Sequence, residues 1–459
     1  MKKKVLSVLM ILTLITGLLA ACGNSSQEAP AKEEQTSSKT EQTASTSEGE
    51  GTSEEAPEQK GFVYPETLAD NNLVIVWNTT EDAWNTTLAD NPNAFDLVWT
   101  TKKAFEEKYG GNVEVIGVGW GDQMGQVISM VNAGERCDLA QAHDQNFPIY
   151  GAKHIVQDIS KYIDLNDGFW YDSVTKAFTF GGVPYAAGAD AAPVVISYNK
   201  TLFDQYGVKT PKEYFDEGNW TWDTFRDVAL QMTGDTDGDG ENDTYGFGWW
   251  DSFYVQMLNT DGITGMAYGA DGSIGSNYLT PQATETFNFL QDAYTKDKFI
   301  MHPDGDSFIN DFKSGKLAMT CEYGFAAITA YQCDYDIEWA PLPIGPSGEQ
   351  YACGGSLGGF SIPVTAENPE GAAVFARMAY ELLTEYNNTA RLELYGQEQV
   401  DLMNTLSAHI NFAPIGIEKY WDANWTIFSG LVDGTPVSTF ANTANEQIVE
   451  GASITLGNE

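Results

Sequence analysis

The chain has 459 residues, 42% of them hydrophobic, and a formal net charge of −41. Residues 1–22 contribute +3 and residues 23–60 contribute −6, which leaves −38 for residues 61–459. A field of this sign argues against nucleic acid, anionic lipid surfaces and acidic substrates as partners. Residues 61–459 are numerous enough for two lobes, because a single core stops growing near ~250–300 residues.

The N-terminal residues form a targeting segment. Lysines at positions 2–4 precede an apolar run over residues 5–19, which is too short and wrongly flanked to span a membrane. The sequence Leu-Ala-Ala-Cys at 19–22 resembles the bacterial lipobox, which implies cleavage before a lipidated Cys22. We therefore expect residues 1–21 to be a signal peptide and the acyl chains, palmitate among them, to anchor Cys22 in the membrane. An ordinary signal peptide with an incidental cysteine is the alternative.

The next segment has the composition of a tether. Residues 23–60 consist mainly of Ser, Thr, Glu, Gln, Ala and Pro and contain no aromatic residue. Such a segment buries too little apolar surface to offset its chain entropy, so we expect disorder. With Cys22 it predicts a tether over residues 22–60 that lifts a domain off the outer face of the membrane, and we favour a Gram-positive cell.

Strand and helix patterns alternate at the start of the domain. Residues 73–77 (LVIVW) form a continuous apolar run, typical of a strand buried on both faces. A helix is predicted over 100–109, a second strand over 113–118, a helix around 127–131 and a third strand over 138–142. This order predicts a doubly wound α/β lobe.

Candidate ligand-binding residues follow the three predicted strands. In doubly wound lobes the ligand lies beyond the carboxyl ends of the strands. Aromatic rings suit the apolar faces of sugars, and amide or carboxylate groups suit their hydroxyls. Residues of both kinds stand together at these ends: Trp77 with Asn78, Trp120 with Asp122, and His143 with Asp144. Burial in the core is the competing interpretation for each tryptophan.

The pattern changes after about residue 180. Residues 180–185 and 193–198 look extended, the chain from 199 onward is richer in helix, and residues 354–363 look like another extended crossover. We therefore expect two lobes joined by two or three crossings, with a cleft between them.

Five motifs resemble those of one family and follow its order along the chain. They are residues 181–213 (GGVPYAAGADAAPVVISYNKTLFDQYGVKTPKE), residues 220–225 (WTWDTF), Gly134-Glu135 with Asp138, residues 312–319 (FKSGKLAM), and residues 341–345 (PLPIG). The chain resembles the extracellular solute-binding proteins of the maltose-binding type over essentially all of 61–459. One departure is Cys137, which stands where that family has a proline.

The resemblance implies a periplasmic-binding-protein-like fold of type II, with a hinge and an interlobe cleft. It suggests lobe one at 61–184 plus 358–408, and lobe two at 185–357 plus 409–459. It also implies a monomer that closes on a carbohydrate, most often an oligosaccharide, and delivers it to the transmembrane subunits of an ABC permease.

Further candidate residues lie in the second half of the domain. Trp249, Trp250 and Asp251 follow a probable strand at 245–248 and offer both rings and a carboxylate. Glu322 and Tyr323 come shortly after the Ala-Met motif. The set is completed by two residues of the extended crossovers, Tyr185 and Gly355.

An acidic loop matches the spacing of a calcium site. Oxygen-bearing residues stand at positions 1, 3, 5 and 9 and a glycine at position 6, as in an EF-hand loop. Gly246 replaces the bidentate glutamate at position 12, so a remote carboxylate or water is needed. An uncompensated acidic turn is the alternative to structural Ca²⁺ bound by Asp235, Asp237, Asp239, Glu241 and Asp243.

Enzyme motifs are weak in this sequence. Gly354 to Gly358 fits G-x-S-x-G, but the following residues look extended rather than helical. The four histidines form no zinc motif. No CxxC pair exists, and Cys321 with Cys333 can pair or remain free thiols. We therefore expect no enzyme, and keep three alternatives: a receptor for a polyamine or other cation, a calcium-dependent surface glycosidase, and an adhesive surface protein.

Overall fold

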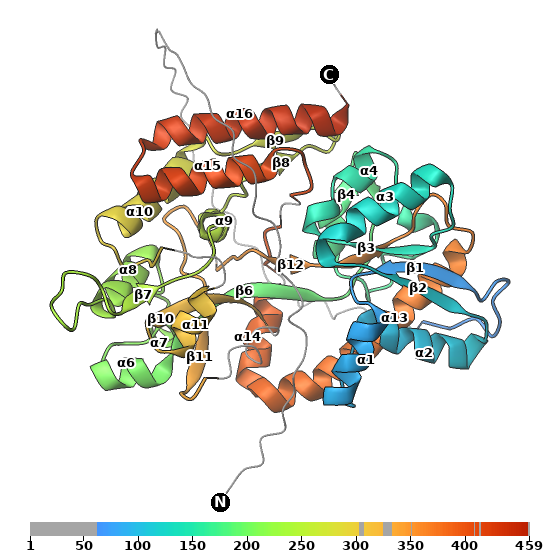
Figure 1. The fold of residues 1–459 in the computed structure, drawn as a ribbon, viewed down its shortest axis with the longest axis horizontal. Coiled ribbons are helices and arrows are strands. Elements are labelled where there is room, and N and C mark those ends of the chain that lie inside the picture. Colours follow the sequence, from blue (N-terminus) through green and yellow to red (C-terminus); the bar gives the residue numbers. More distant parts are fainter. Residues whose placement is uncertain are drawn as a thin grey trace, which may run out of the picture.

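The protein consists of two lobes placed side by side, as the computed structural model in Figure 1 shows. The structure describes residues 62–302, 307–324, 333–349, 351–407, 409–412 and 415–457. The predicted signal peptide, Cys22 and the tether lie outside these residues. In this part of the chain, no helix is long and apolar enough to cross a membrane.

Lobe one is built on a sheet with the order β13-β3-β1-β2. Strands β1 (Leu73–Trp77), β2 (Val113–Gly117) and β3 (Leu139–Ala142) are parallel, and β13 (Gly359–Ser361) joins β3 in antiparallel orientation. The predicted strands and the doubly wound α/β class are confirmed. Hydrophobic clusters cover both faces of this sheet, which explains why β1 is apolar throughout.

Helices and short turns surround this sheet. They are α1 (Glu81–Asp90), α2 (Leu97–Tyr109), α3 (Gln123–Ala133), α4 (Ile149–Ala152), α5 (Asp172–Ala177), α13 (Pro369–Tyr395), the 3₁₀ turns Trp120–Asp122, Asp144–Asn146 and Ile159–Lys161, and the small hairpin β4 (Thr179–Phe180) with β5 (Val183–Pro184). Helix α2 begins three residues before its predicted start, because Asp96 accepts hydrogen bonds from the backbone N–H groups of Val98 and Trp99.

Asp138 ties three segments of lobe one together. Its buried carboxylate accepts hydrogen bonds from the backbone N–H groups of Val74, Glu367 and Asn368, at 2.8, 2.9 and 2.8 Å. Arg136 adds an ion pair at 2.7 Å. The aspartate of the Gly-Glu-x-x-Asp motif is therefore a structural residue of this lobe.

Lobe two is built on a mixed sheet with the order β11-β6-β10-β7. Its strands are β6 (Ala191–Asn199), β7 (Tyr245–Phe247), β10 (Leu317–Tyr323) and β11 (Ile337–Pro341), and β12 (Gly355–Leu357) also pairs with β6. Around it lie α6 (Lys200–Tyr206), α7 (Pro211–Asp216), α8 (Trp222–Gln231), α9 (Phe253–Thr260), α10 (Pro281–Thr295), α11 (Ser307–Lys313), α14 (Gln397–Ser407), α15 (Tyr420–Asp433), α16 (Val437–Leu456) and the hairpin β8 (Met266–Tyr268) with β9 (Ile274–Ser276).

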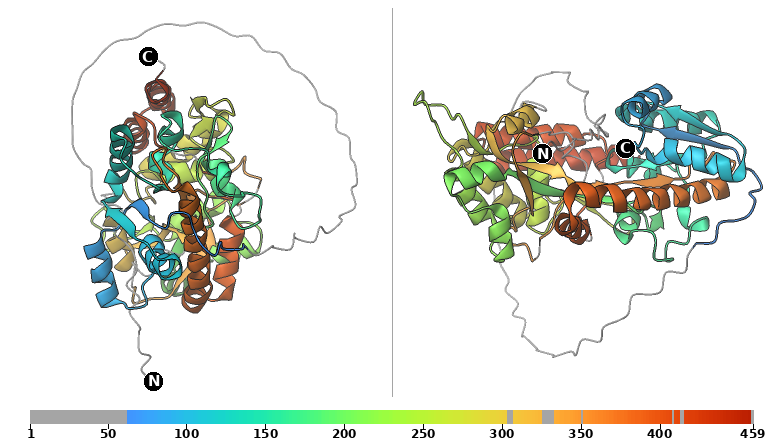
Figure 2. Two further views of the ribbon diagram at one scale, coloured as in Figure 1. Left: turned by 90° about the vertical axis from the view of Figure 1, so that its right-hand side faces the viewer. Right: turned by 90° about the horizontal axis from the view of Figure 1, so that it is seen from below.

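The predicted lobe boundaries need two corrections. Tyr185 and Ala186 pack in the core of lobe one, so the first crossing is β6 itself, not residue 185. Met403 and Leu406 of α14 pack in the core of lobe two, so the chain returns to lobe two along α13 rather than after residue 408. The long helix α13, orange in Figure 2, runs from lobe one toward lobe two. The third crossing is β12 to β13.

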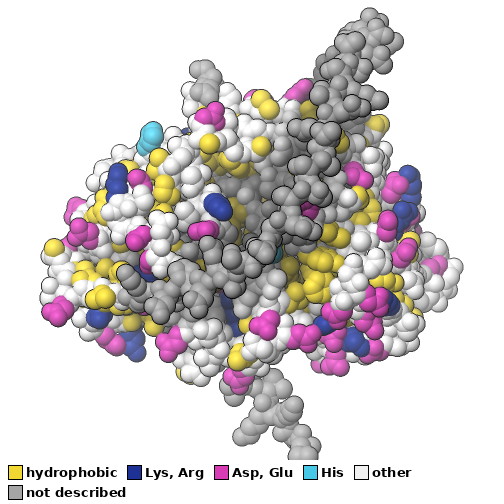
Figure 3. Space-filling view, turned by 180° about the vertical axis from the view of Figure 1, so that it is seen from behind, with side chains coloured by type: hydrophobic (Ala, Val, Ile, Leu, Met, Phe, Trp, Pro, Cys, Tyr) yellow, Lys and Arg dark blue, Asp and Glu magenta, His cyan; other side chains and the backbone are white. Residues whose placement is uncertain are grey.

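None of the four cysteines of the domain forms a disulfide. Cys137, Cys321 and Cys353 are buried and Cys333 is half-buried. The possible pairing of Cys321 with Cys333 is therefore absent. The acidic residues lie on the surface. Carboxylates outnumber basic groups 65 to 24 in the chain, and in the view from behind the acidic side chains are spread over both lobes (Figure 3).

Candidate functional site

Parallel strands of both lobes end at the junction between the lobes, because the charge of Asp144, two residues after β3, reaches Tyr323, the last residue of β10. In lobe one these are β1, β2 and β3; in lobe two they are the parallel pair β7 and β10. Loops at such ends carry the ligand-binding groups of doubly wound folds. The candidate site therefore lies where the two lobes face one another.

Lobe one contributes a histidine and a tryptophan in contact. The rings of His143 and Trp120 lie 4.3 Å apart. His143 Nδ1 accepts a hydrogen bond from the backbone N–H of Gln145, while its buried Nε2 has no partner. Asp144 follows with a partly exposed carboxylate. A ring surface, an unused ring nitrogen and a carboxylate thus stand together.

Lobe two contributes a second aromatic group. The half-buried ring of Trp250 lies 6.2 Å from the ring of Tyr323 and 5.2 Å from that of Phe308. Beside it, the amide of Asn424 donates to Asp251 Oδ2 at 3.3 Å. Burial raises the pKa of the Asp251 carboxyl above its usual range, and the hydrogen bond from Asn424 opposes this shift.

Asp144 connects the two lobes electrostatically. Burial raises the pKa values of Tyr323 and Tyr420, and the charge of Asp144 raises both further. The backbone carbonyl of Asp144 also accepts a hydrogen bond from Ile415 at 2.8 Å. A lobe-one carboxylate therefore lies near tyrosines of β10 and α15 in lobe two.

Sequence reasoning missed the contribution of α15. Trp421 and Trp425 are 57% and 60% exposed, although nearly every other tryptophan that the structure describes is buried or half-buried. The two tryptophans share one helix face, since residues four apart are neighbours there. The signal in the sequence was the pair of tryptophans at i and i+4 in Trp421-Asp-Ala-Asn-Trp425.

Several predicted residues do not reach the site. Trp77 is 5% exposed and donates its indole N–H to Asp96, and Trp249 is 2% exposed; both are core residues. Glu322 is 1% exposed and lies on the opposite sheet face from Tyr323, because side chains alternate along a strand.

Of the remaining candidates, two have structural roles and two lie at the edge of the lobe-one sheet. Tyr185 is a core residue of lobe one. Gly355 lies in β12, where an added Cβ would stand 2.7 Å from the carbonyl oxygen of Ala192, so it serves close strand packing. Asn78 is half-buried and Asp122 is exposed, each just beyond its strand. These last two stay at the carboxyl edge of the lobe-one sheet, as predicted.

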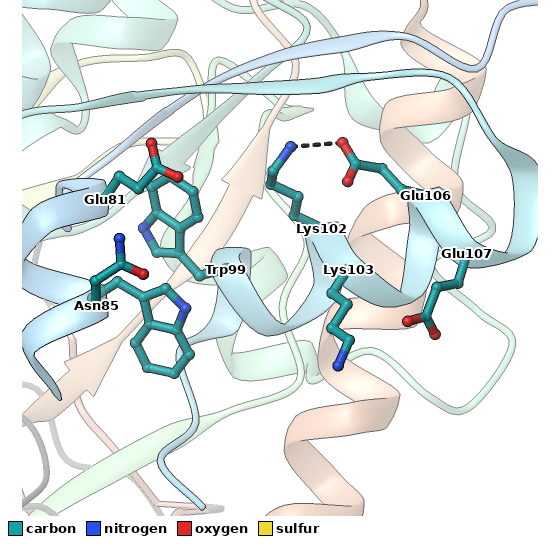
Figure 4. A pocket seen from close by; sticks show the side chains of 8 residues that line it. Glu81, Asn85, Trp99, Lys102, Lys103, Glu106 and Glu107 are labelled. Carbon is teal, nitrogen blue, oxygen red and sulfur yellow. Dashed lines mark hydrogen bonds and ion pairs between the residues drawn. The ribbon is translucent and has the colours of Figure 1, made fainter. Parts of the chain in front are cut away.

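A separate hollow of about 480 Å³ lies between α1 and α2. Its floor is formed by Trp84 and Trp99, which are buried, and Trp99 donates its indole N–H to the carbonyl of Thr79. At its rim Lys102 and Glu106 point toward one another (Figure 4). Because these groups brace α2 against neighbouring backbone, we assign the hollow a structural role and place the site between the lobes.

The acidic loop satisfies only part of the calcium pattern. Asp235, Asp237 and Asp239 each place one oxygen within 4.8 Å of the others. Asp243 is turned toward the backbone N–H of Thr236, and Glu241 donates its own N–H to Asp239. Hydrogen bonds from backbone N–H groups lower the pKa of Asp235, and hydrogen bonds from Thr236 lower the pKa of Asp243. The three aspartates fit a cation, whereas the side chain of Asp243 does not join them.

Close packing explains why position 12 of this loop is a glycine. An added Cβ on Gly246 would stand 2.2 Å from the carbonyl oxygen of Ala229 in α8. A glutamate therefore has no room there. The G-x-S-x-G stretch is likewise structural: Ser356 lies in the strand β12, with no helix after it.

A sequence model of the bacterial extracellular solute-binding proteins matches residues 85–381. The chain belongs to this family. This solute-binding protein is also 26% identical over 272 residues to binding proteins of Brucella abortus and Brucella suis, a stretch covering 54% of the chain and 59% of those relatives. The matched region thus spans less than two thirds of their length.

Solved structures share the fold. An ABC substrate-binding protein from Listeria monocytogenes in complex with cycloalternan matches with a TM-score of 0.64 and 15% identity, over 86% of this chain and 100% of that one. A cyclo/maltodextrin-binding protein complexed with maltotetraose gives 0.62 and 19%, over 84% and 97%. A Staphylococcus aureus solute-binding protein in complex with maltose gives 0.63 and 14%, over 84% and 98%. The predicted two-lobe binding-protein fold is confirmed.

Proposed function

We propose that this solute-binding protein captures a carbohydrate, in particular an oligosaccharide, and delivers it to an ABC permease. One observation carries the proposal: the exposed rings of Trp421 and Trp425 stand on α15, the helix whose Asn424 donates to Asp251. Rings stack on the apolar faces of sugars, and planar carboxylates and amides bind their hydroxyls. The saccharides bound by structural relatives support the same ligand class.

The mechanism we propose is closure of the lobes on the ligand. The sugar first meets the α15 tryptophans, Trp250 and Asp251 on lobe two, and the groups around Asp144 then reach it from lobe one. Binding favours the closed form only by its differential affinity for the two states. The closed monomer then docks on the permease, and no catalytic step is part of this proposal.

The anchor completes the proposed arrangement. Lipidation of Cys22 and the 23–60 tether would hold the receptor on the outer face of a Gram-positive membrane. Mass spectrometry of the mature N-terminus tests this: we expect a diacylated or triacylated Cys22, and Cys22→Ala should release the protein into the medium. An unmodified, cleaved N-terminus would contradict it.

A thermal-shift screen tests the ligand class. The panel holds mono- and oligosaccharides, polyamines and amino acids, each at low and high salt. A ligand that binds only the native state stabilises it by about 2.7 kcal/mol at a hundredfold excess over its dissociation constant. We expect a shift with one family of oligosaccharides, nearly independent of salt. A shift only with polyamines, lost at high salt, would instead favour the cation receptor.

We also propose that the acidic loop binds Ca²⁺ as a structural ion. Support comes from the clustered oxygens of Asp235, Asp237 and Asp239. Carboxylates this close repel one another unless a cation lies among them. Ca²⁺ takes 6–8 oxygen ligands, so backbone carbonyls and water would supply the rest. The ion would stabilise the connection between α8 and β7.

A further inference from the structure

Four polar atoms are buried without partners on one face of the lobe-two sheet. They are both carboxylate oxygens of Glu322 in β10, Oγ of Ser197 in β6 and Nε1 of Trp339 in β11. The strand register explains the cluster: Ser197 pairs with Trp339 on one side and with Thr320, two residues before Glu322, on the other. Native proteins satisfy nearly all buried polar atoms, so such a cluster needs an explanation.

The cluster lies at the end of the helix that crosses between the lobes. The rings of Trp339 and Tyr395, the last residue of α13, are 6.0 Å apart. The charge of Glu322 also acts on Tyr395. Helix α14 then packs on β6 through the face that carries Met403 and Leu406. The end of α13 therefore covers part of this sheet face, and α14 packs on β6 beside it.

No cation that the structure describes compensates the charge of Glu322. Burial raises its pKa to about 8, and the neighbouring Ser197 hydroxyl and Trp339 indole lower the pKa only in part. The other groups that feel its charge are neutral when protonated: Cys321 on the same strand, Cys333 and Tyr335 before β11, and Tyr395 on α13. The charges of Lys313 and Asp334 act on Cys333, and the charge of Arg391, which is paired with Asp190, acts on Tyr395.

We propose that Glu322 is a pH-sensitive switch beneath the interlobe crossing, neutral when α13 and α14 are seated on lobe two and ionised when this seat opens. A buried carboxylate without partners is costly, whereas its protonated form is not. Opening lets the carboxylate ionise in water near its ordinary value of ~4.3. The opening equilibrium should therefore rise about tenfold per pH unit between about pH 5 and pH 8, and then level off.

Amide hydrogen exchange of the full chain tests the proposal. Peptides covering Tyr395 to Ser407 are compared between wild type and Glu322→Gln at each pH, so that intrinsic exchange rates cancel. We expect protection that agrees within about tenfold at pH 5, and exchange at least about a hundredfold faster in the wild type at pH 8. Glu285→Gln, at an exposed position on α10, is the matched control and should behave as wild type. A ratio of wild type to Glu322→Gln that stays constant from pH 5 to pH 8 would overturn the proposal.

A second measurement needs no variant. In the wild type alone, the exchange of α14 peptides is divided by that of α16 peptides, which lie in the same lobe. The proposal expects this ratio to rise by at least about a hundredfold from pH 5 to pH 8. A flat ratio would contradict it even if Glu322→Gln failed to fold.

Discussion

Asn424 in α15 donates its amide to the carboxylate of Asp251, which follows β7 173 residues earlier in the chain. This bond fixes the start of α15 against lobe two and orients the face that carries Trp421 and Trp425. Phe428 continues the same face and packs against Trp425 at 5.7 Å. The exposed tryptophans are thus held on a fixed helix rather than on a loop.

We predict that Trp421→Ala and Trp425→Ala each weaken oligosaccharide binding about tenfold, which is about 1.4 kcal/mol. Each change removes one stacking surface. Because both rings are exposed, the free energy of unfolding should change by only about 0.5 kcal/mol. Isothermal titration calorimetry and urea unfolding check the two parts. Tyr206→Ala, at a position 53% exposed on α6, is the control and should leave affinity unchanged. Unaltered affinity in both tryptophan variants would remove α15 from the site.

A second prediction concerns Asp138. Asp138→Ala leaves the backbone N–H groups of Val74, Glu367 and Asn368 buried without an acceptor. Breaking one partner of a buried charged network costs about 3–5 kcal/mol. We expect the urea midpoint of lobe one to fall accordingly. Asp70→Ala removes the exposed partner of Arg136 and should cost about 1 kcal/mol or less. Equal effects of the two changes would show that burial of Asp138 is not the cause.

The third prediction is a pH dependence set by Asp261. This residue follows the last turn of α9, Oδ1 accepts from Ser347, and Oδ2 is buried without a partner. Burial raises its pKa to about 6, and the negative end of the helix dipole acts in the same direction. The folded protein therefore holds a proton that the unfolded chain loses near pH ~3.9. Stability due to this group should be complete below that pH and be lost as the pH rises toward 6.

The loss amounts to about 3 kcal/mol at most, since one pKa unit is worth about 1.4 kcal/mol. Asp261→Asn cannot ionise, so its stability relative to wild type should increase between pH 4 and pH 6 and stay constant above. Urea unfolding of both proteins at four pH values measures this difference. A difference that does not vary with pH would mean that Asp261 titrates normally.

Metal removal gives the fourth prediction. If Ca²⁺ occupies the acidic loop, chelation should lower the melting temperature and excess Ca²⁺ should restore it, because an ion bound to the native state stabilises it. Asp239→Asn should abolish most of this response. Asp271→Asn, an exposed aspartate in the turn between β8 and β9, serves as the control. Identical melting curves with chelator and with Ca²⁺ would identify the loop as an uncompensated acidic turn.

The sequence by itself determined the class of fold and the edge of the sheet that faces the ligand. Apolar runs such as 73–77 and the helical spacing at 127–131 are local patterns, and burial on one or both faces follows from them directly. The motifs around residues 181–213 are also local patterns, which specify turns and crossings of the chain, and they therefore identified the family. The sequence also shows the spacing of a calcium loop, but it does not show that the side chain of Asp243 turns toward Thr236.

Only the tertiary structure decided which side chains face the cleft. Trp77 ends β1 and Trp120 follows β2, yet the indole of Trp77 points into the core to meet Asp96 and that of Trp120 lies on His143. A single residue's shift along a strand reverses its face, which also separates Glu322 from Tyr323. Trp421 and Trp425 share α15 with Asn424, whose contact with Asp251 spans 173 residues. Such long-range placement depends on how the whole chain packs, and no local pattern contains it.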